Sequence, residues 1–316
     1  MRLMRTIAIA WLLAMGVASA QAQGPAQAPA ASSGATRKAV LVTGASTGIG
    51  RKITERLAAD GYFVYAGARK PQDLQALGTI PNVQAIRIDV TSATDIADAV
   101  ATVTKAGRGL YGIVNNAGVA VSGPLTDTTE EDMQYVMNIN AYGPWRISKA
   151  FAPLVVAEQG RIVTIGSISG ILSGATLGVY SMSKHAVEAF TDSLALQMAP
   201  LGVSVIVVEP GNYDSEIMRT AVARAGGDAK AGDRSQYKPP DEVAASVAQA
   251  LSEATPKRRY MTVPTAREGE ITIRKAIEEL VQLNEGHAYT YDRAALMAML
   301  DEALAKARPK VAAPVP

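Results

Sequence analysis

Short apolar runs alternate with amphipathic segments from Lys38 onward, and this alternation constrains the fold more than any other feature. Apolar runs of about four to eight residues are typical of buried strands, whereas longer segments with a 3.6-residue period are typical of helices. We expect strands at 39–42, 62–66, 83–88, 112–114, 161–165, 203–208 and 259–262, and helices at 48–59, 93–106, 130–158, 179–198 and 241–252. Strands joined through helices form a parallel sheet covered on both faces. The sequence therefore predicts an α/β fold, a single doubly wound Rossmann domain with a seven-stranded parallel sheet.

Composition excludes several classes of protein. Of the 316 residues, 48% are hydrophobic and 19% are charged, which argues against general disorder and against a multispanning membrane protein. The chain has no cysteine, which excludes disulfides, thiolate nucleophiles and cysteine-ligated metals, and with two histidines we expect no metal site. Without Arg2 and Arg5, basic and acidic residues are equal at 29 each. Nucleic-acid binding proteins usually carry an excess of basic residues, which this balance does not show, so we expect no nucleic-acid partner.

The two ends of the chain differ from the middle. Residues 1–22 resemble a signal peptide, because Arg2 and Arg5 precede an apolar run and small residues, and we expect export to the periplasm. An overextended start before a cytoplasmic protein is the alternative. Residues 23–36 are expected to form a flexible linker, 37–262 the main α/β domain, and 263–316 a helical C-terminal extension and tail. After signal removal we expect no membrane span.

A glycine-rich turn follows the first expected strand. Gly44, Gly48 and Gly50 would let the backbone approach a pyrophosphate, and the next helix would offer free N–H groups. The same stretch also fits the G-x-S-x-G pattern of α/β-hydrolases, with Ser46 as nucleophile and His185 or His287 as base. That alternative is disfavoured because such an elbow follows several earlier strands of the sheet, whereas only the signal and linker precede Lys38.

The end of the second strand bears on the choice of cofactor. NAD-binding folds place an acidic residue here to hold the ribose 2′-hydroxyl. This chain has Ala68 and Arg69 instead, and a guanidinium matches a phosphate. The sequence predicts NADP in preference to NAD, unless Arg69 and Lys70 are ordinary solvated charges.

Three side chains suggest acid–base chemistry. Tyr180 and Lys184 lie four residues apart and share one face if their segment is helical, and Ser167 follows the strand at 161–165. An ammonium beside a phenol favours the phenolate, so we expect Lys184 to lower the pKa of Tyr180. Taken singly, such a pair is usually a surface feature and such a serine a turn residue.

Six motifs in order over 38–262 make the chain resemble the classical short-chain dehydrogenases/reductases, in the style of their retinol and steroid dehydrogenase branch. The glycine turn is similar to the family's TGxxxGxG, and Tyr180–Lys184 to its YxxxK. The resemblance implies catalytic roles for Ser167, Tyr180, Lys184 and Asn140, with Asn140 and Lys184 holding a water chain. It implies cofactor contacts at Gly44, Ser46, Gly48, Ile49, Gly50, Arg69, Asp89, Val90, Asn116, Ala117, Gly118, Tyr180, Lys184, Pro210, Gly211 and Ser215. Ser215 stands where the family has threonine.

The resulting prediction is an NADP-dependent oxidoreductase that moves hydride between nicotinamide and a ketone, aldehyde or alcohol, with Tyr180 as general acid/base. The partner is a small carbonyl or alcohol substrate, and the resemblance implies a homodimer or homotetramer. A lid is expected over 212–239. The alternative is a non-catalytic, nucleotide-binding regulatory protein. Trp145 is expected in the core and His185 in a structural role.

Overall fold

The computed structural model describes residues 37–307, so the expected signal peptide at 1–22 and linker at 23–36 lie outside the described residues. Seven parallel strands form one sheet in the order β3-β2-β1-β4-β5-β6-β7. The strands are β1 (Ala39–Val42), β2 (Phe63–Ala68), β3 (Val83–Arg87), β4 (Gly112–Asn115), β5 (Arg161–Ile165), β6 (Ser204–Pro210) and β7 (Arg259–Thr262). The expected doubly wound α/β sheet is confirmed.

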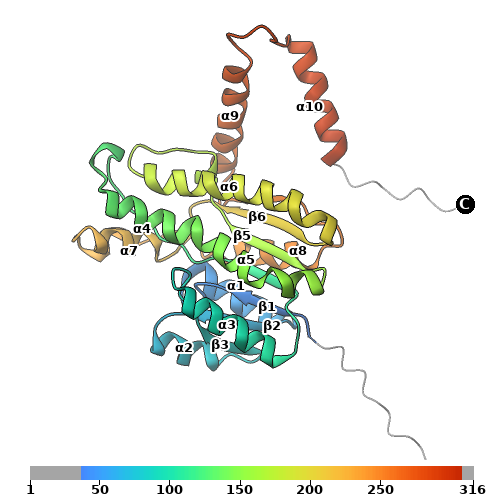
Figure 1. The fold of residues 1–316 in the computed structure, drawn as a ribbon. Helices are drawn as coiled ribbons and strands as arrows, with labels where there is room; N and C mark the ends of the chain where they lie inside the picture. The colour runs from blue at the N-terminus through green and yellow to red at the C-terminus, as the bar shows by residue number, and fades with distance from the viewer. Residues whose placement is uncertain (1–36, 308–316) are drawn as a thin grey trace, which may run out of the picture. The chain divides into compact units, whose positions relative to one another are not determined.

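Helices cover both faces of the sheet (Figure 1). One face packs against α1 (Gly48–Ala59), α2 (Pro71–Gly78) and α8 (Asp241–Ser252). The other packs against α3 (Ala93–Ala106), α4 (Glu130–Asn140), α5 (Tyr142–Ala157) and α6 (Gly178–Met198). The remaining helices are α7 (Ile217–Arg224), α9 (Ala266–Leu283), α10 (Arg293–Ala307) and the short turns η1 (Leu125–Asp127), η2 (Ile168–Gly170), η3 (Ala199–Leu201) and η4 (Ala229–Gly232).

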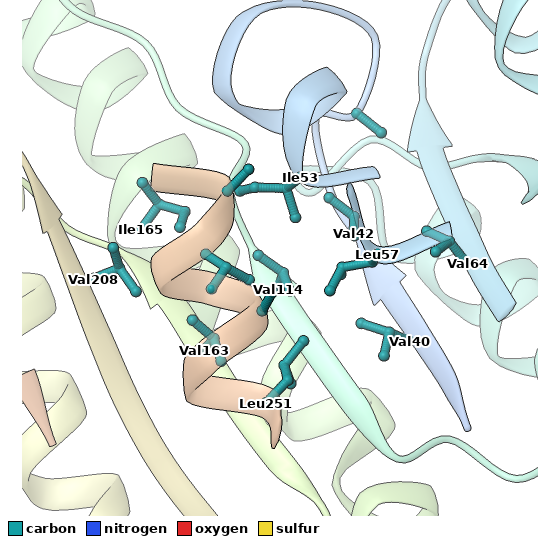
Figure 2. Packing of buried hydrophobic residues seen from close by; sticks show 14 of the residues in the cluster. Val40, Val42, Ile53, Leu57, Val64, Val114, Val163, Ile165, Val208 and Leu251 are labelled. Carbon is teal, nitrogen blue, oxygen red and sulfur yellow. The ribbon is translucent and has the colours of Figure 1, made fainter. Parts of the chain in front are cut away.

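The alternating side chains of each strand divide the core into two halves. Val40 and Val42 of β1 enter the half beneath α1 and α8, whereas Leu41 between them enters the opposite half. Figure 2 shows the first half, where Ile53 and Leu57 of α1 and Leu251 meet valines of neighbouring strands. A strand buried on both faces needs an unbroken apolar run, which is why the motif before the glycine turn reads AVLV.

The expected helix over 130–158 is wrong, because the structure contains two helices there. α4 ends at Asn140 and α5 begins at Tyr142. Pro144 lies in the first turn of α5 and has no N–H to donate to the carbonyl of Asn140, so one continuous helix would lose a hydrogen bond at this point. The expectation that Trp145 lies in the core is also wrong, since its side chain is 49% exposed on α5.

Smaller differences concern the boundaries. β2, β4 and β6 extend beyond their expected ends, β2 begins one residue later, and α2 and α7 were not expected. The helical extension after residue 262 consists of α9 and α10, which lie beyond the sheet in Figure 1. Within 37–307, no helix has the length and apolar character that crossing a membrane requires.

The order of the strands determines where a ligand can bind. The chain winds outward from β1 to β3 and then returns to β4 on the other side of β1. Loops after β1 and β4 therefore diverge at their carboxyl ends and leave a crevice between them, the place where open α/β sheets bind ligands.

Candidate active site

The turn after β1 is tied to the end of β4 by hydrogen bonds. The amide Nδ2 of Asn116 donates to the carbonyl oxygens of Thr43 and Gly44, each at 2.9 Å. In the opposite direction, Thr43 Oγ1 accepts from the backbone N–H groups of Asn116 and Ala117, at 3.0 and 3.1 Å. Asn116, expected to contact the cofactor, therefore also holds the glycine turn in place.

The three glycines of the turn serve different needs. A Cβ on Gly50 would lie 2.1 Å from the carbonyl oxygen of Gly44, and a Cβ on Gly44 would lie 2.9 Å from Cα of Ala117. Both Gly44 and Gly48 have positive φ, 63° and 51°, a region that side chains disfavour. Gly48 has more room, with Ser215 as its nearest neighbour at 3.6 Å.

The beginning of α1 has the features of a phosphate site. Thr47 precedes the helix and makes no side-chain hydrogen bond to the first turn, and that turn contains no acidic residue. Its N–H groups and the positive end of the helix dipole therefore face the crevice without a capping side chain. A pyrophosphate fits this position.

The adenosine end of the crevice contains Arg69 and Asp89. Arg69 Nη1 lies 3.6 Å from Asp89 Oδ2, and the Arg69 side chain is largely exposed. Burial alone would raise the pKa of Asp89, but hydrogen bonds from Thr91 and the charge on Arg69 lower it. Ala68 is buried at the end of β2, and Arg69, Lys70 and Asp73 line the cavity after it.

Tyr180 and Lys184 extend from the same face of α6, as expected. Lys184 is buried, and its Nζ donates to the carbonyl oxygen of Ile165 at the end of β5, at 2.8 Å. The same Nζ lies 5.5 Å from the centre of the Tyr180 ring. Ser167 follows β5 by two residues; its Oγ donates to the carbonyl of Pro210 at 3.4 Å and accepts from the N–H of Ser169 at 3.1 Å.

The expected lowering of the Tyr180 pKa by Lys184 is not found. Burial raises the pKa of Tyr180, while a hydrogen bond with Ser167 and the charge on Arg234 oppose the rise. Lys184 points to the Ile165 carbonyl instead of the phenol oxygen, which explains its small effect. Burial also lowers the pKa of Lys184 to about 8, opposed by the carboxylate of Glu188.

Asn140 lies at the C-terminal end of α4, where the helix breaks. Its Oδ1 accepts from the N–H of Val119 at 2.9 Å, and its Nδ2 donates to the Val119 carbonyl at 2.8 Å and to Ser183 Oγ at 2.9 Å. Asn140 is 2% exposed and does not line the cavity. It contacts Ser183, the residue before Lys184.

A single cavity of about 670 Å³ brings these groups together. Except for Asn140, every residue expected at the site lines it: Gly44, Ser46, Gly48, Ile49, Gly50, Arg69, Asp89, Val90, Asn116, Ala117, Gly118, Ser167, Tyr180, Lys184, Pro210, Gly211 and Ser215. Neither histidine lines the cavity; Nδ1 of His185 pairs with the Ser181 carbonyl at 2.9 Å. Ser46 thus lacks an imidazole base, which removes the hydrolase alternative.

Ile271, which lines the cavity from α9, was not expected from the sequence. Arg234 and Met218 line it from the segment 212–239, where a lid with Met218 as part of its apolar surface is expected. No role was predicted for Arg234, because its sequence context gives no motif. Thr43, which anchors the glycine turn, could have been found as the residue between β1 and Gly44.

A cluster of buried carboxylates lies behind Lys184. Glu188 follows Lys184 by one turn of α6, and Glu209 lies one residue before the end of β6. Arg259 Nε lies 3.0 Å from Glu188 Oε2 and 3.6 Å from Glu209 Oε1. Burial and the charge on Glu188 raise the pKa of Glu209, and burial also raises the pKa of Glu188. Among residues 37–307, Oε1 of Glu188 and Oε1 of Glu209 accept no hydrogen bond. One proton shared between these two carboxyl groups would give each of them a partner.

We predict a pH-dependent gain in stability for Glu209→Gln. A carboxyl with a raised native pKa keeps a proton that the unfolded chain releases, so the wild-type free energy of unfolding falls as pH rises above the ordinary value of 4.5. Glutamine cannot ionise, so the variant should gain about 1–3 kcal/mol relative to wild type between roughly pH 5 and 8. Urea unfolding across this range measures the difference.

Glu253→Gln is the control with the opposite sign. The hydrogen bond from Tyr260 lowers the pKa of Glu253, so this variant should lose stability relative to wild type as pH rises toward 4.5, and the loss should stay constant from about pH 5 to 8. A Glu209→Gln difference that does not change with pH would contradict the buried carboxyl pair.

Comparisons with known proteins agree with this geometry. A family model described as short chain dehydrogenase matches residues 38–225. The mitochondrial D-beta-hydroxybutyrate dehydrogenase of Bos taurus is 34% identical over 187 residues, which cover 56% of this chain and 54% of that protein. Retinol dehydrogenase 5 of Mus musculus is 37% identical over 184 residues, 56% of this chain and 57% of that protein. The chain thus spans about half the length of the curated relatives it matches.

A solved structure gives the same result over more of the chain. The short chain dehydrogenase from Burkholderia cenocepacia, described as in complex with NADP, has a TM-score of 0.65 and 25% identity, and the match covers 78% of this chain and 95% of that one. The expected resemblance is confirmed, including the likeness to a retinol dehydrogenase. With the matched family model, the parallel sheet and the glycine turn at its switch point, this chain belongs to the short-chain dehydrogenase family.

Proposed function

We propose that this protein is an NADP(H)-dependent oxidoreductase that interconverts a ketone or aldehyde with the corresponding alcohol. The observation that carries the proposal is the convergence of Ser167, Tyr180 and Lys184 on one cavity with the glycine turn. Named relatives support the chemistry, since hydroxybutyrate and retinol dehydrogenases act on hydroxyl groups by their names.

Each reacting side chain has a distinct role in this proposal. The hydroxyl of Ser167 turns its single proton from the Pro210 carbonyl to the substrate oxygen, while its own oxygen continues to accept from the N–H of Ser169. Tyr180 gives that oxygen a proton during reduction and takes one during oxidation. Lys184, fixed by the Ile165 carbonyl, contributes a positive charge beneath the phenol ring. When bound, the nicotinamide supplies or accepts the hydride.

The cofactor contacts follow the lining of the crevice. The unpaired N–H groups at the start of α1 would bind the pyrophosphate, and Arg69 would bind the 2′-phosphate of NADP. Pro210, Gly211 and Ser215 lie on the side where the nicotinamide would reach Tyr180. Asn140 would act through Ser183 on the segment that holds Lys184.

Replacing the phenol hydroxyl tests the role of Tyr180. Tyr180→Phe should retain NADPH binding and lose turnover by about 10²- to 10⁴-fold, because the proton donor is removed while the ring stays. Cofactor binding is measured by fluorescence titration and turnover by the absorbance of NADPH with a panel of carbonyl compounds.

Tyr289→Phe, at an exposed position near the C-terminal helices, is the matched control and should not alter turnover. An active Tyr180→Phe enzyme would refute the assigned role. Tight NADPH binding by a wild-type protein that reduces nothing would instead favour the non-catalytic regulatory protein.

NADP preference is proposed from the end of β2. Ala68 leaves space, Arg69 offers a guanidinium at the cavity mouth, and the Burkholderia neighbour is described in complex with NADP. The ion pair with Asp89 orients Arg69 toward this end of the crevice.

We expect Arg69→Ala to weaken NADPH binding roughly 10- to 100-fold and NADH binding little, since only NADPH carries a 2′-phosphate on its adenosine ribose. Dissociation constants for both cofactors, measured for wild type, Arg69→Ala and the exposed control Arg56→Ala, give the ratio. Equal losses for the two cofactors would show that Arg69 does not bind the 2′-phosphate.

Export and self-association are proposed from features outside the site. The basic start and apolar run of residues 1–22 support a cleaved signal and a periplasmic location, against a cytoplasmic protein with an overextended start. The exposed aromatic rings of Tyr142 and Trp145 on α5 support a homodimer or homotetramer.

Intact-mass measurement of the protein from its native cells tests the signal. We expect a mature chain that begins near residue 21 or 23, because small residues at 18, 20 and 22 precede these positions. A mass that includes Met1 would contradict the proposal of a cleaved signal.

A further inference from the structure

One arginine of the lid lies in the same cavity as the reacting groups. Arg234 follows η4 in the segment between β6 and α8, and its side chain is half-buried. Its Nη2 donates to Asn212 Oδ1 at 2.9 Å and its Nε to the Tyr213 carbonyl at 3.3 Å. The guanidinium also lies 4.2 Å from the centre of the Tyr237 ring. All three partners are uncharged, so the positive charge stays uncompensated by them.

Neighbouring basic side chains of the lid are paired with acids. Arg219 pairs with Glu216 and Asp233, and Lys238 with Glu242. Among residues 37–307, by contrast, no carboxylate forms an ion pair with Arg234. Glu268 contacts the same asparagine, since its carboxylate accepts from the Asn212 N–H at 2.7 Å.

Arg234 is held near the reacting end of the cavity, because its partner Asn212 follows Pro210 by two residues and the Pro210 carbonyl accepts from Ser167. The charge of Arg234 favours the ionised form of the Tyr180 hydroxyl and opposes the rise in the Tyr180 pKa that burial causes. The expected pyrophosphate position lies elsewhere, at Gly48 and the first turn of α1. The free N–H groups of Arg234, including those on Nη1, therefore belong to the substrate end.

Apolar side chains form part of the wall there, beside Thr220 and Glu216, whose carboxylate pairs with Arg219. Leu172 and Leu177 line it from the segment after β5, Met218 from α7 and Ile271 from α9. Such a wall has no hydrogen bonds to offer and suits a hydrocarbon chain. A half-buried guanidinium beside an apolar wall selects a ligand with both an anionic group and a carbon chain, because an unpaired buried charge is unfavourable.

We propose that Arg234 binds a carboxylate on the substrate, so that the protein reduces oxo acids, or oxidises hydroxy acids, whose chain lies against the apolar wall. Guanidinium and carboxylate match in shape and can form two parallel hydrogen bonds. This inference rests on the proposed oxidoreductase function. Reduction adds a hydride to the carbonyl carbon and the Tyr180 proton to its oxygen, oxidises NADPH to NADP⁺ and leaves the carboxylate unchanged.

Paired substrates test the inference without any mutation. We would measure kcat/KM with NADPH for straight-chain oxo acids of about four to ten carbons, with the ketone at different positions, and for their methyl esters. The ester removes the charge and keeps the chain. The preferred oxo acid should exceed its ester by roughly 10- to 100-fold, the range expected for hydrogen bonds to a charged group.

Variants then assign the preference to one side chain. Arg234→Met should abolish the advantage of acid over ester, and Arg234→Lys should retain part of it, because an ammonium keeps the charge without the fork. Arg219→Met, at the paired lid arginine that does not line the cavity, should retain the full preference. Melting temperatures check folding, and NADPH dissociation constants should be the same for all four proteins.

The outcomes separate the two proposals. If wild type reduces esters as well as acids, or if Arg234→Met lowers both equally, the carboxylate proposal is overturned while the oxidoreductase proposal stands. Weaker NADPH binding in Arg234→Met with an unchanged acid-to-ester ratio would place Arg234 on the cofactor and also overturn it. If neither acids nor esters are reduced by protein that binds NADPH, the oxidoreductase proposal fails and this inference falls with it.

Discussion

The hydrogen-bonded bridge between Thr43 and Asn116 is the contact on which the rest of the site depends. It joins the ends of β1 and β4, the two strands between which the chain reverses its direction across the sheet. Each hydrogen bond of the bridge joins a short side chain to a backbone group of the other strand's loop. The bridge therefore fixes the glycine turn within a narrow range of positions. The opening of α1 is thereby directed into the crevice, and the cavity wall from Asn116 to Gly118 follows from the same bridge.

A second set of hydrogen bonds positions Lys184 and Ser167 at this crevice. Lys184 reaches from α6 to the carbonyl at the end of β5, and Ser167, two residues after β5, reaches the carbonyl of Pro210 at the end of β6. Burial is the main influence on both groups: it raises the pKa of Tyr180 and lowers the pKa of Lys184. The charge on Arg234 opposes the rise in the Tyr180 pKa, and Glu188 behind Lys184 favours the protonated form of Lys184. The lid and the acidic cluster are therefore parts of the same electrostatic environment.

Periodicity was enough to predict the sheet and most helix boundaries, because each strand is buried on both faces and must be apolar throughout. It failed over 130–158, where both helices share an amphipathic pattern and only Pro144 marks the break. Motifs placed the cofactor turn and the Tyr180–Lys184 pair, whose spacing is local. Arg234 and Ile271 could not be found this way, since nothing local distinguishes them and only the packing of the segment 212–239 and of α9 brings them to the cavity. The direction of the Lys184 side chain likewise depends on a carbonyl of another strand.

A crystal structure of the protein grown with NADPH would show where the cofactor binds. We predict the pyrophosphate over Gly48 and the first turn of α1, the 2′-phosphate at Arg69, and the nicotinamide ring beside Tyr180, Lys184 and Ser167. A nucleotide bound elsewhere on the sheet, or a nicotinamide ring directed away from these three side chains, would contradict this prediction.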